Sequence, residues 1–208
     1  MIIAVDGPAA SGKGTIARAL ADHFGLPLLD TGLLYRAVGL TVLRSGDDPS
    51  SEADAAAACA FDDSLLDDPE LRTETAGQAA SKVSAHPTVR AALIKRQKDF
   101  AAQPGGAILD GRDIGTVIAP RADAKLYITA SAEIRAARRQ AEEPMSNYHV
   151  ILADIKERDA RDAGRDAAPL RQADDAILLD TSDLSIEQAV QQAIALVEAQ
   201  LSSSQKGA

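Results

Sequence analysis

The most chemically informative residues lie near the start of the chain, where a glycine-rich run ends in a lysine. An apolar run at residues 2–5 precedes it, and a helical pattern begins at Ile16. Glycines at both ends allow backbone N–H groups to converge on one point, and the next helix adds the positive end of its dipole. Lys13 brings a full charge to the same place. We therefore predict a polyphosphate-binding loop, hereafter the phosphate loop, formed by Gly7, Pro8, Ala9, Ala10, Ser11, Gly12, Lys13, Gly14 and Thr15.

A magnesium site is expected beside this loop. In the general motif a Ser or Thr follows the lysine and binds the metal, whereas here Gly14 takes that position and the hydroxyl moves to Thr15. Asp110 closes an apolar strand, where a carboxylate can hold magnesium through water as a Walker B acid does. We predict Thr15 and Asp110 as the metal-binding residues.

Polar residues also follow the second and third predicted strands. Asp30, Thr31 and Arg36 come after the second, and Arg112 and Asp113 follow Asp110 after the third. Ligands of doubly wound sheets bind at this carboxyl edge. The alternative for each residue is a turn or a helix cap.

A helix is predicted around residues 148–165, and one of its faces changes character along its length. The face begins as an apolar stripe and continues at the same angular position with Arg158, Asp162 and Arg165, with Arg161 at its side. We interpret this row as an arm that brings arginines over bound phosphates; the alternative is a solvated face.

The charge balance excludes some classes of partner. A net charge of −9 repels polymeric nucleic acid and anionic membranes, so any anion must be bound locally. Seven arginines nevertheless lie between residues 131 and 171, which favours a dedicated phosphate site. The chain shows no targeting signal and no long apolar segment, so we expect a cytoplasmic protein, and we expect a monomer.

Apolar runs alternate with helical patterns, which indicates an α/β fold with a parallel sheet. The runs fall at residues 2–5, 26–29, 107–109, 125–129 and 176–179. The first helix is predicted to end at Gly25 and the last to run from about Ser185 to Leu201, leaving a frayed tail. Two interruptions, at residues 31–106 and 131–175, are too long for single crossovers and are mainly helical in pattern.

Several motifs together resemble bacterial cytidylate kinases, a family of P-loop nucleoside monophosphate kinases. They are the phosphate loop, Leu29-Asp30-Thr31-Gly32, Tyr35-Arg36, Asp110-Gly111-Arg112-Asp113-Ile114-Gly115-Thr116 and Lys156-Glu157-Arg158-Asp159-x-Arg161-Asp162. The resemblance implies one P-loop kinase domain with a five-stranded parallel sheet. Its core would be residues 1–30, 105–131 and 175–201, its monophosphate-binding insertion about 31–104, and its arginine-bearing lid about 140–172. Residues 61–73 read as helix and turn where many relatives carry extra strands.

The resemblance also implies roles for individual residues toward CMP. Arg36, Arg112 and Arg165 match contacts to the phosphate; Ser81, Arg90 and Asp113 match contacts near the base; Arg158 and Asp162 match contacts near the sugar; Asp30 and Thr31 complete the CMP-binding set. A carboxylate at Asp113 suits cytosine, because it accepts from the amino group of CMP and repels the carbonyl of UMP.

The implied reaction is ATP-dependent, magnesium-assisted phosphoryl transfer to CMP, and to dCMP, giving the diphosphate and ADP. Lys13, Arg112, Arg158 and Arg161 would be the catalytic residues, and Arg135, Arg138 or Arg139 would lie near the adenine. One alternative is a related small-molecule kinase acting on UMP, AMP or shikimate. Another is a nucleotide-binding regulatory module, although the Asn-Lys-x-Asp guanine motif of GTPase switches does not occur.

Overall fold

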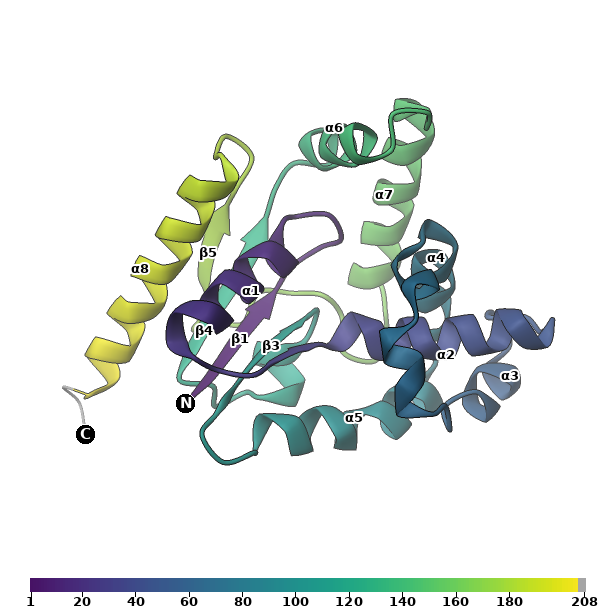
Figure 1. Ribbon diagram of the computed structural model, residues 1–208, viewed down its shortest axis with the longest axis horizontal. Helices are drawn as coiled ribbons and strands as arrows, with labels where there is room; N and C mark the ends of the chain where they lie inside the picture. The colour runs from purple at the N-terminus through teal and green to yellow at the C-terminus, as the bar shows by residue number, and fades with distance from the viewer. Residues whose placement is uncertain (206–208) are drawn as a thin grey trace. The chain divides into compact units, whose positions relative to one another are not determined.

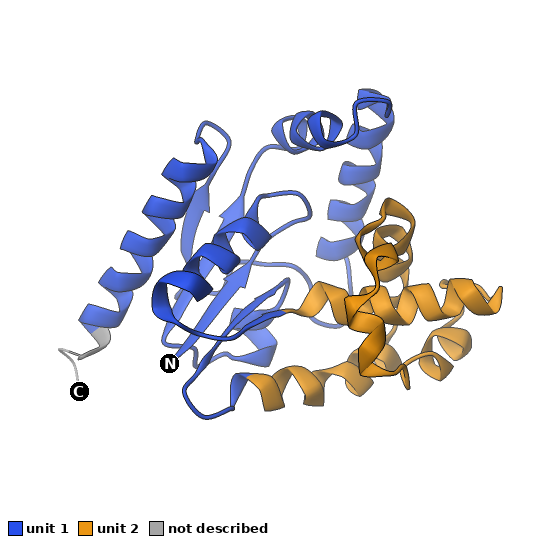
Figure 2. Ribbon diagram, viewed as in Figure 1, with its two compact units in different colours: residues 1–29, 101–208 blue, residues 30–100 orange. Residues whose placement is uncertain are grey.

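The computed structural model describes residues 1–205, which form two compact units (Figure 2). Unit 1 comprises residues 1–29 and the described residues from 101 onward, and unit 2 comprises residues 30–100. The phosphate loop and the sheet, apart from the strand residue Asp30, lie in unit 1, whereas the rest of unit 2 is helical or loop.

The sheet has five strands in the order β2-β3-β1-β4-β5 (Figure 1). The strands are β1 (Ile2–Asp6), β2 (Leu28–Asp30), β3 (Ala107–Gly111), β4 (Ala124–Thr129) and β5 (Ile177–Asp180). β1 pairs in parallel with β3 and with β4, and β4 pairs in parallel with β5. The predicted parallel α/β sheet is confirmed, and each of the five apolar runs overlaps one strand.

Two helices pack on the same core of the sheet, α1 (Lys13–Phe24) and α8 (Ile186–Gln205). Ile16 and Leu20 of α1 and Ala193 and Val197 of α8 are buried there with strand residues such as Ile3. α1 ends at Gly25, as predicted, with φ of 62°. The helix start near Ser185 is also confirmed, because Ser185 Oγ accepts from the backbone N–H of Gln188 at 3.2 Å.

The prediction of a frayed tail is wrong for residues 202–205, which continue α8. The Ser202 hydroxyl donates to the carbonyl of Glu198 at 2.8 Å, and the Ser203 hydroxyl donates to that of Gln200 at 2.8 Å. These bonds to the preceding turn let two serines remain helical. Residues 206–208 of the predicted tail lie outside the described part of the chain.

The second long interruption forms α6 (Ala132–Glu142) and α7 (Tyr148–Ala163). Ile151 and Ile155 of the predicted apolar stripe pack against Ala136 of α6. α7 ends before Arg165, so the prediction that this arginine lies on the helix is wrong. Gly164 caps the helix, with its N–H bonded to the Ala160 carbonyl.

Unit 2 follows the expectation of a mainly helical insertion. Its elements are α2 (Thr31–Ser45), α3 (Glu52–Ala57), two 3₁₀ helices η1 (Asp63–Asp67) and η2 (Pro69–Arg72), α4 (Glu74–Val83) and α5 (Pro87–Ala101). The 3₁₀ helices occupy the segment predicted as helix and turn. Leu71 of η2 is fully buried with Ala37 and Leu40 of α2, so this short segment packs into the core of the unit.

After β3, a π-helical turn η3 (Ile114–Ile118) precedes β4. Among residues 1–205, no helix is both long enough and apolar enough to cross a membrane.

Candidate active site

The phosphate loop connects β1 to α1 and adopts backbone conformations that only some residues allow. Gly7 has φ of 154°, and a Cβ added there would lie 2.0 Å from the Ile128 carbonyl oxygen of β4. Ala10, which is not a glycine, has φ of 58°. The loop is therefore shaped by a close approach to β4 as well as by its own sequence.

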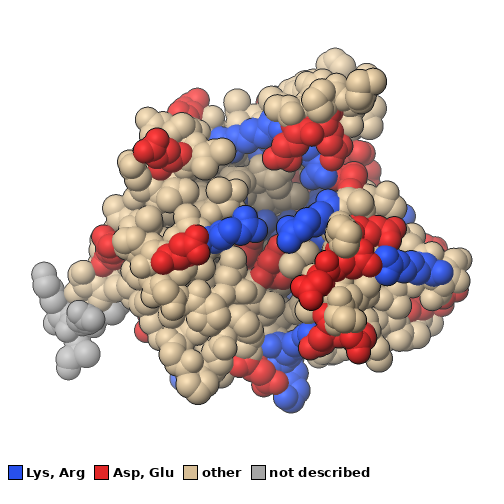
Figure 3. Space-filling view, in the orientation of Figure 1, with Lys and Arg blue, Asp and Glu red and all other residues tan. Residues whose placement is uncertain are grey.

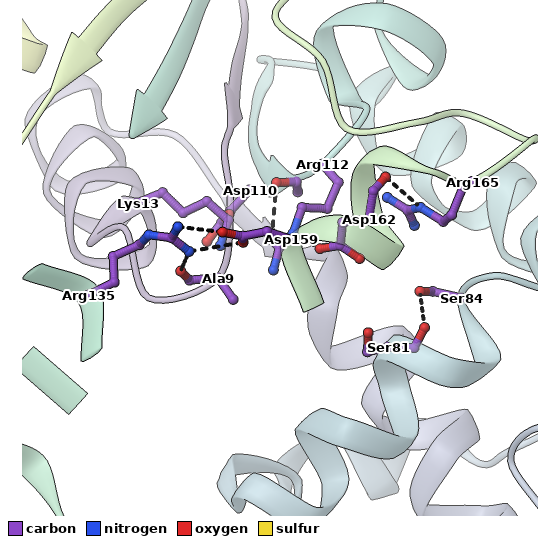
Figure 4. Close-up of polar contacts among 11 residues, drawn as sticks. Ala9, Lys13, Ser81, Ser84, Asp110, Arg112, Arg135, Asp159, Asp162 and Arg165 are labelled. Atoms are coloured by element: carbon purple, nitrogen blue, oxygen red, sulfur yellow. Dashed lines mark hydrogen bonds and ion pairs between the residues drawn. The ribbon is translucent and has the colours of Figure 1, made fainter. Parts of the chain in front are cut away.

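Lys13 and Asp110 meet beside this loop. Lys13 Nζ lies 3.5 Å from Asp110 Oδ1, and Asp110 is 4 % exposed (Figure 4). A Cβ added at Gly14 would lie 3.4 Å from Asp110 Oδ2, so the carboxylate also borders the residue that replaces the usual Ser or Thr. The cation and the candidate metal-binding acid thus come together in unit 1, whereas the Thr15 residue is solvent-exposed.

A second charged cluster surrounds Asp162 of α7. Arg112 Nε donates to Asp162 Oδ2 at 3.0 Å, and Arg165 Nε donates to the Asp162 carbonyl at 3.2 Å (Figure 4). Burial acts to raise the pKa of the Asp162 carboxyl, but the charges of Arg112, Arg165 and Arg158 outweigh it, so the pKa is lowered. Three of the predicted arginines therefore gather around one buried carboxylate, although Arg165 reaches it from beyond the helix.

Arg161 lies on the same helix and forms an ion pair with Glu157, one turn away. Its side chain is 23 % exposed. The helix thus presents both a buried charged cluster and a more accessible arginine.

Asp6 is a buried acid that our sequence analysis did not select. It ends β1, and its two carboxylate oxygens accept from the backbone N–H groups of Ile114 at 2.8 Å and Gly115 at 2.7 Å. Burial raises the pKa of Asp6 to about 7, with smaller contributions from the charges of Asp113 and Asp110. These bonds hold the segment that follows Asp113. The signal available in the sequence was an acid at the end of a strand immediately before Gly7.

A pocket of about 580 Å³ opens beside the phosphate loop. Residues 10–16 line one side, Arg138 and Arg139 of α6 another, and the segment from Thr181 into α8 a third, with apolar contributions from Leu184, Ile186 and Ala189. In Figure 3, Lys and Arg side chains border the hollow between α6 and the start of α1. The pocket combines apolar walls with guanidinium groups next to the phosphate loop.

Arg135, the third arginine of α6 considered for this region, has a different position. It is 4 % exposed and does not line the pocket. Its guanidinium donates to the carbonyl of Ala9 and to both carboxylate oxygens of Asp159 (Figure 4). Of the three arginines of α6, Arg138 and Arg139 therefore line the pocket and Arg135 does not.

Of the remaining predicted residues, Asp113 is buried in unit 1, and the others belong to unit 2. Asp30 caps α2 by accepting from the Gly32 N–H at 2.9 Å, and Thr31 is the buried first residue of that helix. Arg36 donates to the carbonyls of Leu71 at 2.6 Å and Thr73 at 2.9 Å. The Asp30 side chain therefore caps a helix, which was the alternative interpretation of this residue.

Ser81 and Arg90, the predicted base contacts of unit 2, are both buried, at 2 % and 4 % exposure. The Ser81 carbonyl accepts from the Ser84 hydroxyl at 3.0 Å, and the Arg90 guanidinium lies 5.9 Å from the centre of the Tyr35 ring. The unit therefore keeps a buried cation stacked on an aromatic side chain.

Known proteins share the fold of this chain. Among solved structures, the chain is similar in fold to a gluconokinase from Sinorhizobium meliloti 1021, with a TM-score of 0.58, 14% sequence identity and coverage of 99% of this chain and 96% of that chain. It also resembles a sugar kinase from Janibacter sp. HTCC2649, with a TM-score of 0.52, 14% identity and coverage of 97% and 96%.

Sequence relatives are much nearer. The chain is 59% identical to a cytidylate kinase of Xanthobacter autotrophicus over 96% of this chain and 98% of the relative. It is 57% identical to one of Caulobacter vibrioides, covering 95% of each. The model of the family described as cytidylate kinase matches residues 3–199, and the chain belongs to this family.

Proposed function

We propose that this enzyme transfers the terminal phosphoryl group of ATP to CMP, and to dCMP, giving the nucleoside diphosphate and ADP. Membership of the cytidylate kinase family supports the reaction. The observation that carries the site assignment is the convergence of Arg112, Arg158 and Arg165 on Asp162, in the same unit as the phosphate loop.

The phosphate loop and the neighbouring pocket would bind the donor. The triphosphate would accept hydrogen bonds from loop N–H groups and meet Lys13, and the base would enter the pocket of about 580 Å³. Arg138 and Arg139 offer guanidinium planes there, and Leu184 and Ile186 offer apolar surface. We propose this pocket as the adenine site, for which the sequence suggested only Arg135, Arg138 or Arg139.

Magnesium would lie with the donor phosphates, close to Asp110. The fit is good, because the carboxylate is buried beside Gly14 and Lys13 and carboxylate oxygen is a preferred magnesium ligand. Thr15 would add a hydroxyl, with water completing the shell. When bound, the metal neutralises charge on the donor oxygens.

The side chains of this chain contribute position and positive charge to the transfer. The accepting phosphate is already anionic, so no side-chain base is required. Lys13, Arg112, Arg158 and Arg161 would stabilise the charge that spreads over the phosphoryl group in flight. In this assignment residues of about 140–172, which include α7, are the lid that excludes water from ATP.

Unit 2 is proposed as the monophosphate-binding insertion. Arg36, Arg112 and Arg165 would contact the CMP phosphate; Ser81, Arg90 and Asp113 would contact the base; Arg158 and Asp162 would contact the sugar. Asp30 and Thr31 complete the set as first residues of α2. The buried Arg90 supports a role in base selection, because an unmatched base would leave a buried donor unsatisfied.

The proposal is tested by measuring ADP release with ATP and a series of acceptors. We expect turnover of CMP and dCMP at least about tenfold above UMP and AMP, since a hydrogen-bonding base site discriminates strongly. Comparable rates with UMP or AMP would refute the assignment of Asp113 and Arg90. ATP hydrolysis at the same rate without an acceptor would instead favour the regulatory module.

A monomeric state and a cytoplasmic location are further proposals. Light scattering of the purified protein tests the first, and cell fractionation followed by detection of the protein tests the second.

A further inference from the structure

Arg135 joins three parts of unit 1 through one buried guanidinium. Nη1 donates to the Ala9 carbonyl of the phosphate loop at 3.1 Å and to Asp159 Oδ1 of α7 at 3.0 Å. Nη2 donates to Asp159 Oδ2 at 2.5 Å, and Nε donates to the Ala130 carbonyl at 2.9 Å, next to the start of α6. Arg135 is 4 % exposed, so these protein oxygens, and not water, accept the hydrogen bonds of its guanidinium.

The bond to Ala9 matters because of how a phosphate loop works. If its N–H groups point toward the phosphates, the carbonyls of the same peptide planes point the other way and need donors of their own. Arg135 supplies the donor for Ala9, and the Thr181 hydroxyl lies 3.1 Å from the carbonyls of both Ser11 and Thr129, between which its one proton is shared. Ala10 lies between the Ala9 and Ser11 carbonyls in the left-handed region, with φ of 58°. The two donors therefore hold the loop on both sides of its strained residue.

The bond to Asp159 places the same arginine in contact with α7. Asp159 directly follows Arg158 and precedes Asp162 by less than one turn, so it shares the helix end that carries the charged cluster. Any displacement of that helix end would pull on the guanidinium that holds Ala9.

We propose that Arg135 is a positioning residue that couples α7 to the shape of the phosphate loop, so that donor binding depends on the Arg135–Asp159 ion pair. The inference rests on the proposed nucleotide-binding role of the loop. It does not depend on which acceptor is phosphorylated, because its primary test is ADP binding without acceptor.

A matched control exists on the same pair of helices. Lys156 of α7 and Glu133 of α6 also form an ion pair, at 2.9 Å, but both side chains are more than half exposed. The Ala9 carbonyl is bonded by Arg135 and not by this pair, so Glu133→Gln removes an α6–α7 ion pair while leaving the bond to Ala9 in place.

The experiment measures ADP affinity by titration calorimetry for the wild type, Arg135→Met, Asp159→Asn and the double variant, with Glu133→Gln as control. Thermal unfolding establishes that each variant is folded. We expect Arg135→Met to weaken ADP binding about tenfold or more and Asp159→Asn about threefold to fivefold, since each removes charge-assisted hydrogen bonds. Glu133→Gln should stay within about twofold, because exposed pairs contribute little.

The double variant decides whether the pair acts as a unit. We expect Asp159→Asn to have no additional effect once Arg135 is Met, because its influence passes through that arginine. The inference is overturned if Asp159→Asn weakens ADP binding equally in both backgrounds, if Glu133→Gln weakens it as much as Asp159→Asn, or if Arg135→Met binds ADP normally.

Two further measurements separate positioning from simple stabilisation. In the kinase assay, KM for ATP should rise while KM for CMP stays within about twofold, and Arg135→Lys should recover part of the ADP affinity because an ammonium can still donate to Ala9. If Arg135→Met does not fold, the cycle is repeated with Arg135→Lys, for which the same non-additivity with Asp159→Asn is expected and simple additivity overturns the proposal.

Discussion

Arg112 donates through Nε to Asp162 Oδ2 at 3.0 Å, and this bond connects the segment after β3 to the end of α7. The two residues are 50 positions apart in the chain. The charges of Arg158 and Arg165 act on the same carboxylate, so Asp162 is the acid that three guanidiniums share. Its negative charge lowers the repulsion among the three arginines.

Replacing Asp162 by Asn should disrupt this cluster with little change in shape. The amide cannot offset the three positive charges, and the arginines would repel one another in a buried site. We expect kcat/KM to fall about a hundredfold, in the range found when an electrostatic contact to the reacting group is lost. Steady-state kinetics with CMP measures this, and exposed Asp166→Asn serves as the control. A loss of less than about threefold would contradict the role assigned to the cluster.

Asp110→Asn should change the requirement for magnesium. Asp110 lies 3.5 Å from Lys13 Nζ and beside Gly14, so the loss of its charge weakens the proposed metal site. We expect the half-saturating magnesium concentration to rise about fivefold or more, with part of kcat recovered at high magnesium. Titration of activity against free magnesium at fixed ATP measures it. An unchanged magnesium curve would assign Asp110 to holding Lys13 alone.

Two glycines of the phosphate loop should respond differently to alanine. At Gly7 the new Cβ would lie 2.0 Å from the Ile128 carbonyl oxygen, so the loop must move away from β4. At Gly12 nothing lies within 4 Å, and only the φ of 85° is unfavourable. We expect Gly12→Ala to lose about 1–2 kcal/mol of unfolding free energy and Gly7→Ala to lose clearly more. Denaturant unfolding measures both, and equal losses would argue against the close approach to β4.

Asp6 should give the enzyme a pH-dependent stability. Its pKa is raised from 3.8 to about 7, so between these values the folded state keeps a proton that the unfolded state releases. Stability from this group therefore falls as pH rises from about 4 to about 7. In Asp6→Asn the side chain at this position no longer titrates. Replacing one carboxylate oxygen by an amide nitrogen can lower the free energy of unfolding, but that loss is the same at every pH.

The measurement is the unfolding free energy of wild type and Asp6→Asn at pH 5 and pH 8. The wild type should lose up to about 3 kcal/mol more than the variant over this interval, from the usual value of about 1.4 kcal/mol per pKa unit. Parallel pH dependence in the two proteins would show that Asp6 does not titrate in this range.

Asp113→Ala should affect the acceptor and leave the donor unchanged. Asp113 is buried and immediately precedes the segment that Asp6 holds, and the family resemblance assigns it to the cytosine amino group. We expect CMP turnover to be largely lost while ADP affinity stays within about twofold, because the phosphate loop is untouched. An unchanged CMP rate would count against base recognition by Asp113.

Local sequence patterns were sufficient to predict the strands of the core and to select candidate residues beside the phosphate loop. Alternating apolar runs predicted all five strands, and the left-handed preference of glycine predicted the end of α1 at Gly25. The phosphate loop and Asp110 could be selected because their chemistry depends on short-range order: a strand, a turn and a helix start.

Contacts between distant segments decided the rest. Arg135 reaches Ala9 across 126 positions, and Asp6 reaches Gly115 across 109, so no local pattern could assign either residue its role. The helix face that begins at Tyr148 predicted that Arg165 lies on α7. The helix instead ends at Gly164, and Arg165 donates to the Asp162 carbonyl from the segment after the helix. Periodicity fixes which residues share a face, whereas burial and hydrogen bonding across the fold determine which charges meet.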